Sequence, residues 1–283
     1  MKYRIGGLLF LVLAVTLLSF VPRKLTWVAI GDSITYLNEH PDETGNRITA
    51  GYMSRVVKQL PELQYINHGY NGWTACGIAN KIEELNFPRA DIYSIFLGTN
   101  DWWAGLPIGT FADYENKTGN GTVNGAFRTI IDKLRSLNPD APVILMTPLQ
   151  RSDFVYIKDA NNNAYGSYKP KAGQTLLRLV QALDTIAAKE KLVKVDLYRK
   201  SGITPETAVK FKRLKDPQTG EYKNYTWPAY KDIPFDTKQE EYPYPLAAVN
   251  MTYDGLHPSD KGYQAITNML LKAMKPLLPR IKD

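Results

Sequence analysis

Residues 26–34 read TWVAIGDSI, an apolar run that ends in Gly31, Asp32 and Ser33. Four further runs of strand length follow it along the chain. The five predicted strands are Thr26–Ile30, Leu63–Asn67, Asp91–Leu97, Pro142–Met146 and Leu192–Leu197. Most of them are continuously apolar rather than alternating, which is typical of parallel strands that are covered on both faces.

Helical periodicity separates these runs. The five predicted helices are Ile48–Gln59, Gly77–Leu85, Val123–Leu137, Gln174–Lys189 and Asp260–Leu277. Strands that alternate with helices predict an α/β fold of three layers, with a doubly wound parallel sheet of five strands between helices. Since no internal repeat or linker is found, we expect residues 25–283 to form a single domain.

Residues 215–250 depart from this alternation of strands and helices. The stretch is rich in aromatic residues and proline: Tyr222, Tyr225, Trp227, Tyr230, Phe235, Tyr242 and Tyr244 stand among Pro228, Pro234, Pro243 and Pro245. Such a sequence cannot form a regular helix, and it is longer than ordinary connections in compact domains. We expect an insertion that packs over one end of the sheet.

The first 24 residues have the form of an export signal. Lys2 and Arg4 precede the segment 5–21, which carries no charge over 17 residues. As a helix this segment would reach about 25 Å, the short end of what spans a bilayer. The expectation is either an uncleaved membrane anchor or a cleaved signal peptide, with a buried core helix as the alternative. The two leading cases both place the domain outside the cytoplasm, in the periplasm or the extracellular space.

Composition excludes several other classes of protein. The chain of 283 residues has a formal charge of +7, but four of its 35 basic residues lie in residues 1–24, which have no acid. The remainder has 31 basic and 28 acidic residues, with no basic cluster of the kind that tracks nucleic-acid phosphates. One cysteine, Cys76, excludes an intrachain disulfide framework and a zinc site of several thiolates. Three histidines exclude a histidine-rich metal cluster.

Polar blocks follow the predicted strands, at the edge where the sites of open α/β sheets lie. They are Gly31-Asp32-Ser33, His68-Gly69-Tyr70-Asn71-Gly72 and Gly98-Thr99-Asn100-Asp101, and Asp254-Gly255-Leu256-His257 lies near the C-terminus. Together they supply a hydroxyl, an imidazole, a carboxylate and hydrogen-bond donors for an oxyanion. This is the inventory that acyl transfer requires.

Each residue alone has a more ordinary interpretation. Ser33 or His257 could cap a helix, and Asn100 could be a turn residue. His68 competes with His257 as the base, although no carboxylate stands three or four residues from His68. The combination of blocks is more specific than any one of them.

In residues, order and position, these blocks resemble the SGNH/GDSL hydrolase family. Gly31-Asp32-Ser33-Ile34 is similar to the nucleophile block of that family, with Ile34 in place of leucine. Gly72, residues 98–101 and residues 254–257 match its other three blocks. The resemblance spans nearly all of the chain after residue 25 and implies the flavodoxin-like sheet of that family.

The resemblance also implies roles. Ser33 would be the nucleophile, His257 its general base and Asp254 the residue that orients the imidazole. The oxyanion donors would be the backbone N–H groups of Ser33 and Gly72 and the side-chain amide of Asn100. It implies no cofactor and no metal.

The sequence leaves the substrate open. We expect an exported serine esterase that acts on a short acyl ester, an acetyl ester of a carbohydrate being the favoured substrate, and on no nucleic acid. Trp102 and Trp103 follow the Asn100 block, so we expect them at the rim of the site, where flat rings suit sugars. The alternatives are a lipase or lysophospholipase, an acyltransferase, a flavodoxin-like cofactor-binding module and a non-catalytic carbohydrate-binding protein. The oligomeric state is not predicted.

Overall fold

The computed structural model describes residues 23–282. The predicted leader, residues 1–24, lies outside these residues except for Arg23 and Lys24. Within residues 23–282, no helix has the length and apolar character needed to cross a membrane.

The predicted sheet is confirmed. Its five strands are β1 (Leu25–Gly31), β2 (Leu63–Gly69), β3 (Ile92–Phe96), β4 (Val143–Met146) and β7 (Val193–Val195). All neighbours pair in parallel, in the order β2-β1-β3-β4-β7. This is the doubly wound, flavodoxin-like order, in which the chain reverses direction across the sheet between β1 and β3. Their carboxyl ends therefore meet at one edge of the sheet.

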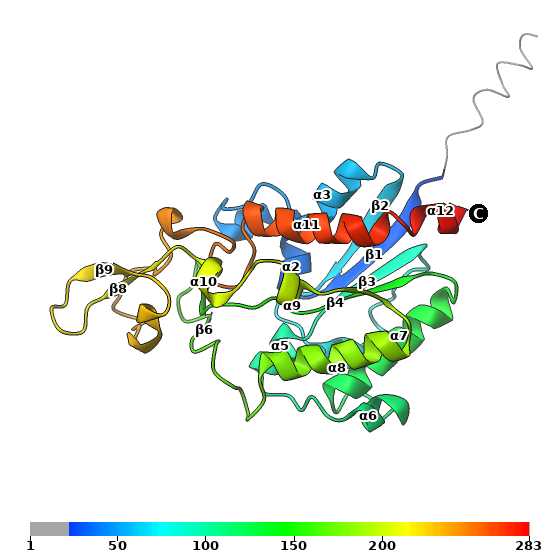
Figure 1. Cartoon of the computed structure of the whole chain (residues 1–283), viewed down its shortest axis with the longest axis horizontal. Coiled ribbons are helices and arrows are strands. Elements are labelled where there is room, and N and C mark those ends of the chain that lie inside the picture. The colour runs from blue at the N-terminus through cyan, green and yellow to red at the C-terminus, as the bar shows by residue number, and fades with distance from the viewer. Residues whose placement is uncertain (1–22, 283) are drawn as a thin grey trace, which may run out of the picture.

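Helices cover both faces of the sheet (Figure 1). Those of eight or more residues are α3 (Tyr52–Gln59), α7 (Val123–Leu137), α8 (Leu176–Lys189) and α11 (Asp260–Met274). The shorter ones are α2 (Ser33–Tyr36), α4 (Ala75–Asn80), α5 (Thr99–Trp103), α6 (Phe111–Glu115), α9 (Leu197–Lys200), α10 (Pro205–Ala208) and α12 (Leu278–Lys282). Four 3₁₀ helices are Leu37–Glu39, Pro41–Thr44, Ala229–Asp232 and Leu246–Ala248.

The helix predicted over Gly77–Leu85 differs in its bounds. Helix α4 starts two residues earlier and ends at Asn80. Thr74 caps it by accepting a hydrogen bond from the N–H of Gly77, and the Asp101 carboxylate accepts from the N–H groups of Ala75 and Cys76. Those first-turn N–H groups have no partner within the helix, so a distant carboxylate fixes where it begins.

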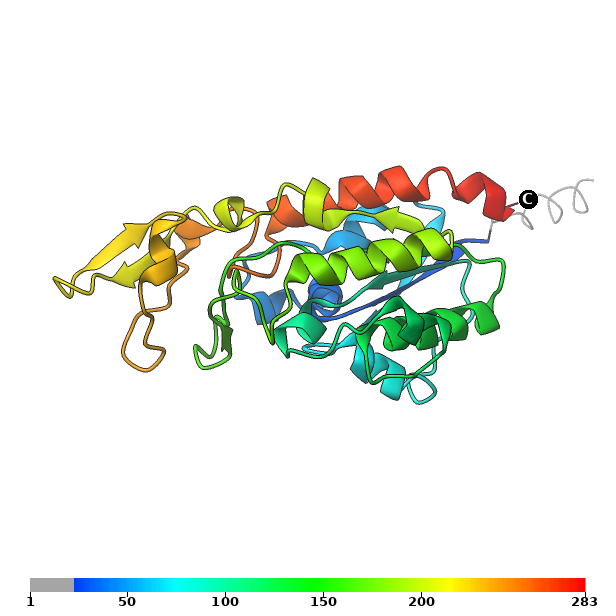
Figure 2. The same ribbon diagram turned by 60° about the horizontal axis from the view of Figure 1, so that its bottom comes forward.

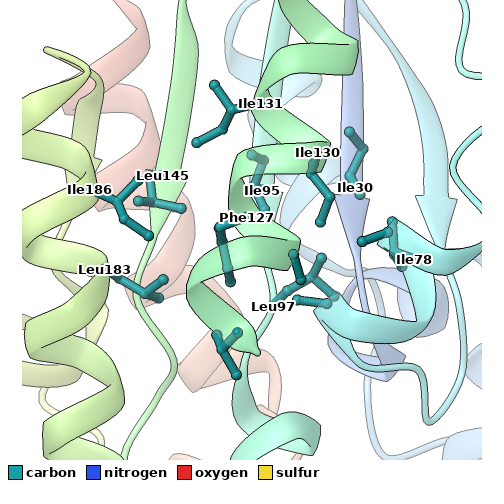
Figure 3. Packing of buried hydrophobic residues seen from close by; sticks show 14 of the residues in the cluster. Ile30, Ile78, Ile95, Leu97, Phe127, Ile130, Ile131, Leu145, Leu183 and Ile186 are labelled. Carbon is teal, nitrogen blue, oxygen red and sulfur yellow. The ribbon is translucent and has the colours of Figure 1, made fainter. Parts of the chain in front are cut away.

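Two hydrophobic layers hold the helices to the sheet. Val28 and Ile30 of β1 face α4, α7 and α8, and Figure 3 shows Ile30, Ile95 and Leu145 packed under Phe127 and Ile130 of α7. The alternate residues of β1, Trp27 and Ala29, face α3 and α11 in the second layer. Burial on both faces explains why the strands read as continuous apolar runs.

The segment predicted as an insertion extends from the edge of the sheet where the strands have their carboxyl ends. It contains a hairpin, β8 (Lys212–Lys215) and β9 (Tyr222–Tyr225), that projects beyond the sheet (Figures 1 and 2). The hairpin starts three residues before the predicted boundary. A second irregular segment, residues 147–175, lies at the same edge and holds a short pair of strands, β5 (Phe154–Val155) and β6 (Asn163–Ala164). The sequence did not predict this second pair.

Candidate active site

Ser33 is the first residue of α2, and Asp32 alone separates it from the end of β1. The turn is tight, because Asp32 caps the helix by accepting a hydrogen bond from the N–H of Ile34 at 3.0 Å. A Cβ at Gly31 would lie 2.0 Å from Oγ1 of Thr35, so only glycine fits between the strand and the helix. The Ser33 N–H, in the first turn, has no partner within the helix. This local structure presents both the hydroxyl and the N–H of Ser33 to the edge of the sheet.

Ser33, His257 and Asp254 form a chain of hydrogen bonds. Nε2 of His257 lies 2.8 Å from Oγ of Ser33, and Nδ1 of His257 lies 2.7 Å from Oδ2 of Asp254. Asp254 is fully buried, whereas Ser33 and His257 each keep 6% of their surface exposed. A hydroxyl bonded to an imidazole, itself held by a carboxylate, is the arrangement of an activated nucleophile.

Hydrogen bonds within the loop fix the positions of Asp254 and His257. Oδ1 of Asp254 accepts hydrogen bonds from the N–H groups of Leu256 and His257, at 3.1 and 2.7 Å. The N–H of Tyr253 donates to the carbonyl of His257 at 3.0 Å. The imidazole ring also lies between the rings of Phe154 and Tyr253, whose centroids are 5.1 and 5.8 Å away. The imidazole therefore has one well-defined orientation.

A cavity of about 140 Å³ opens in front of Ser33. Gly72, Asn100 and Trp103 line it together with Ser33 and His257. The Asn100 amide donates one hydrogen bond to the carbonyl of Trp73 at 2.9 Å, which leaves its second N–H for another acceptor. Gly72 has φ of +76°, and a Cβ there would meet nothing within 4 Å. The structure thus places the three residues that were predicted to supply oxyanion donors around the cavity. The glycine at 72 suits a left-handed backbone.

Ionisation of the Asp32 carboxyl group costs free energy at this buried position. Its carboxylate is buried, and burial raises the pKa of Asp32 from 3.8 to about 6, against the hydrogen bond from Ile34 and the nearby His257, which lower it. Asp32 therefore titrates in a range where an ordinary aspartate is fully ionised.

His68 is not part of this arrangement. Its Nδ1 lies 2.8 Å from the hydroxyl of Tyr70, and its ring packs edge-on against Phe87. Burial lowers the pKa of His68. The competing interpretation of His68 as the base for Ser33 has no support in its contacts.

Trp102, predicted at the rim of the site, does not line the cavity that holds Ser33. Trp102 is 2% exposed, packs in the layer below α7 and α8, and donates its indole N–H to the carbonyl of Gln174 at 2.9 Å. The next residue, Trp103, does line the cavity, but the ammonium of Lys171 lies 3.5 Å from the centroid of its ring. The two side chains, from adjacent residues of α5, lie about 100° apart around the helix axis. Trp102 lines a second cavity, of about 310 Å³, that also includes Arg151.

Sequence reasoning missed Arg151, which also lines the cavity. It lies in the segment that follows β4, at the same edge of the sheet as Ser33. The sites of open α/β sheets lie at the carboxyl ends of strands, so the position of this segment after the fourth strand is the sequence signal that points to it. Among the described residues, no group of three or more His, Cys, Asp or Glu side chains is placed to hold a metal ion.

Comparisons with known proteins show the family of this chain. The sequence model of the GDSL-like lipase/acylhydrolase family matches residues 29–265. The crystal structure of a possible lipase from Chitinophaga pinensis is 56% identical to this chain, with a TM-score of 0.88, over 90% of this chain and 99% of that one. No curated protein matches the chain.

Two more distant structures share the fold. One is the acetyl xylan esterase AlAXEase, 15% identical with a TM-score of 0.52, over 88% of this chain and 99% of that one. The other is the acetylxylan esterase Axe2 from Geobacillus stearothermophilus, 19% identical with a TM-score of 0.50, over 89% of this chain and 94% of that one.

Proposed function

Because the chain belongs to the GDSL-like lipase/acylhydrolase family and is a carboxylic ester hydrolase, we propose that Ser33, His257 and Asp254 are its catalytic triad. The observation that carries this proposal is the continuous hydrogen-bond chain from Asp254 through His257 to Ser33. The three residues come from two segments more than 220 residues apart, so no local turn or cap explains their meeting.

The geometry supports a two-step reaction. Oγ of Ser33 attacks the ester carbonyl while its proton passes to Nε2 of His257, and Asp254 stabilises the imidazolium that forms. The carbonyl oxygen becomes an oxyanion, which the N–H groups of Ser33 and Gly72 and the Asn100 amide can receive. His257 then returns the proton to the departing alcohol. Water attacks the acyl-enzyme in the same way and releases the acid.

We propose a short acyl group, with an acetyl ester of a carbohydrate as the substrate. The volume of the cavity beside Ser33, about 140 Å³, supports this choice, because pockets that enclose drug-sized ligands measure roughly 300–1,000 Å³. A lipase acting on long chains is the second candidate, since the 56%-identical structure is described as a possible lipase. An acyltransferase would use the same acyl-enzyme and pass the acyl group to a sugar hydroxyl.

The experiment that tests the triad is active-site labelling with a phosphonylating reagent. We expect one label per chain on Ser33 and none in Ser33→Ala, because only a hydroxyl activated by His257 attacks phosphorus readily. A correctly folded protein that takes up no label would contradict the triad and favour a non-catalytic binding protein. Acyl 4-nitrophenyl esters from acetyl to octanoyl then test chain length, and a preference for octanoyl would favour the lipase.

We also propose that the domain is exported, on the strength of the basic start and the uncharged residues 5–21. The full-length chain should be found outside the cytoplasm, either in membranes or with a new N-terminus near residue 22. A chain lacking residues 1–24 should keep full activity, because every proposed catalytic residue follows Trp27. Recovery of the intact full-length chain in the cytoplasm would contradict export.

A further inference from the structure

Arg151 is a buried cation that forms no ion pair within residues 23–282, and its guanidinium carbon lies 5.3 Å from the centroid of the Trp103 ring. Its side chain is 3% exposed. Among residues 23–282 its hydrogen bonding amounts to a long contact from Nε to the carbonyl of Ser152 at 3.5 Å, and the buried Nη2 has no partner. Buried guanidinium groups are normally paired, because losing water costs free energy that only hydrogen bonds and counter-charges offset. Burial lowers the pKa of Arg151 to about 10, so it still carries its charge at neutral pH.

Three carboxylates lie near Arg151, and each has hydrogen bonds to other groups. Asp32 accepts from the N–H of Ile34. Asp254 binds His257 and two backbone N–H groups. Asp153 forms a fully buried ion pair with Lys212 and also accepts from the N–H groups of Gly166 and Ser167. The charges of Asp254, Asp153 and Asp32 act on Arg151 over a distance, but none of the three forms an ion pair with it. The guanidinium therefore has N–H groups left to bind another acceptor.

Two cavities meet at Arg151. One is the 140 Å³ cavity that holds Ser33. The other, of about 310 Å³, is lined by Gln150, Ser167, Tyr168, Lys169 and Tyr198 in addition to Arg151. The residues that line the two cavities include two cations, Arg151 and Lys169, and no carboxylate. A third cation, Lys171, lies against Trp103, and burial together with the neighbouring Arg151 lowers its pKa.

The larger cavity has the chemistry of a binding site for a charged sugar. Tyr168 and Tyr198 offer ring surface, while Gln150 and Ser167 offer hydrogen-bonding groups. Arg151 lies between this cavity and Ser33. An anionic group that reached Arg151 would complete the hydrogen bonds that the guanidinium lacks, and a planar fork of N–H donors suits carboxylate and phosphate oxygens.

We propose that Arg151 binds an anionic group, a carboxylate or a phosphate, carried by the part of the ester substrate that lies outside the acyl cavity. The preferred substrate would then be an acyl ester of an acidic sugar rather than of a neutral one. This inference rests on the proposed function for the reaction at Ser33, but the binding of the anion can be measured without turnover.

The binding test measures the melting temperature of the full chain with glucuronate, glucose 6-phosphate or glucose as the probe. We expect a rise with glucuronate or with the sugar phosphate, and the larger rise identifies the anion. Glucose should give no rise. Arg151→Met should lower the affinity for the anion at least 10-fold, and Arg151→Lys should lower it less, because lysine keeps the charge but loses the fork. Arg178→Gln is the matched control, since it removes one exposed arginine of α8 whose side chain lines neither cavity.

The kinetic test compares kcat/KM for acetylated glucuronate and acetylated glucose. The ratio of the two values should fall about 10- to 100-fold in Arg151→Met and stay unchanged in Arg178→Gln. Without ligand, Arg151→Met should melt no lower than the parent protein, because the buried guanidinium makes almost no hydrogen bonds. A lower melting temperature with an unchanged ratio would assign Arg151 a structural role and overturn the proposal.

The outcomes separate this inference from the proposed function. If neither anion stabilises the parent protein, or if glucose stabilises it equally, the anion site is wrong even when Ser33 hydrolyses 4-nitrophenyl acetate. If no ester is hydrolysed but glucuronate binds in an Arg151-dependent manner, the proposed reaction is wrong and the anion site stands.

Discussion

The backbone carbonyl of Asp153 occupies the space that a side chain on Gly255 would need. A Cβ at position 255 would lie 1.7 Å from that oxygen and 2.9 Å from the hydroxyl of Tyr244. Gly255 also has φ of +92°, in the left-handed region that favours glycine. The N–H of Ser152 donates to the carbonyl of Gly255, and the N–H of Val155 donates to the carbonyl of Asp254. The loop that carries Asp254 and His257 thus packs directly on the segment that follows β4.

We therefore expect Gly255→Ala to displace Asp254 and His257. A shift of about 1 Å at the reacting groups can lower kcat about 10²-fold. Gly202→Ala is the matched control, because Gly202 also has a positive φ, +74°, but its Cβ would meet nothing within 4 Å. The control should lose only the roughly 1–2 kcal/mol of the left-handed conformation and keep its kcat. Equal losses of activity in the two variants, measured with 4-nitrophenyl acetate, would contradict the steric argument.

Asn100→Ala should lower kcat about 10²- to 10³-fold with little change in KM. The Asn100 amide donates only one of its two N–H groups to Trp73, and the second becomes important when the carbonyl oxygen carries charge. The exposed Asn120, whose side chain contacts Asn80, provides the control Asn120→Ala. Steady-state kinetics with an acetyl ester measure the effect. A change confined to KM would make Asn100 a residue that positions the substrate.

Lys212→Met should destabilise the protein by about 3–5 kcal/mol. Lys212 and Asp153 are both fully buried, and removing the ammonium leaves an uncompensated carboxylate. The double variant Lys212→Met with Asp153→Asn should recover much of this loss, since neither charge then remains. Chemical denaturation of the two single variants and the double variant gives the coupling free energy. If the two single losses simply add in the double variant, the buried pair makes no net contribution.

Asp32→Asn should remove the contribution of Asp32 to the pH dependence of the free energy of unfolding between about pH 4 and 6. Burial raises the pKa of Asp32 to about 6, so between pH 4 and 6 the folded protein holds a proton that the unfolded chain releases. The free energy of unfolding should therefore fall as the pH rises through this range, by up to about 3 kcal/mol. Asparagine keeps an oxygen that can accept from Ile34, so the cap survives and the variant should be the more stable protein above pH 6. Parallel curves of stability against pH for the two proteins would show that Asp32 does not titrate there.

The sheet could be predicted because its signal is local. The inner strands β1, β3 and β4 are buried on both faces, so residues such as Val28 and Ile95 mark them by composition alone, whereas the edge strands β2 and β7 are partly exposed. The blocks around Ser33, Asn100 and His257 could be predicted because each follows a strand or precedes a helix in a fixed order. Their meeting at one edge then follows from the parallel topology.

The residues that were missed depend on contacts over long sequence distances. Trp102 and Trp103 are adjacent and chemically alike, and only the packing of α5 decides that Trp102 is in the core. Helix α4 begins where Asp101 accepts two of its N–H groups, which the sequence around Ala75 does not reveal. Arg151 has no distinguishing pattern in its neighbours, and it differs from an ordinary surface arginine only through its burial.

The ammonium of Lys212 also lies 4.1 Å from the ring centroid of Tyr230 and 4.8 Å from that of Tyr165, so one side chain from β8 links the projecting segment to the residues after β4. These two segments and the Asp254 loop consequently depend on one another for their contacts, so a chimaeric protein should take all three from the same parent. If residues 212–245 were grafted alone onto a related hydrolase, Lys212 would arrive without its carboxylate, and Asp153 left behind would lose its counter-charge. Engineers who wish to transfer substrate preference between such enzymes should move residues 147–175 and 205–258 together.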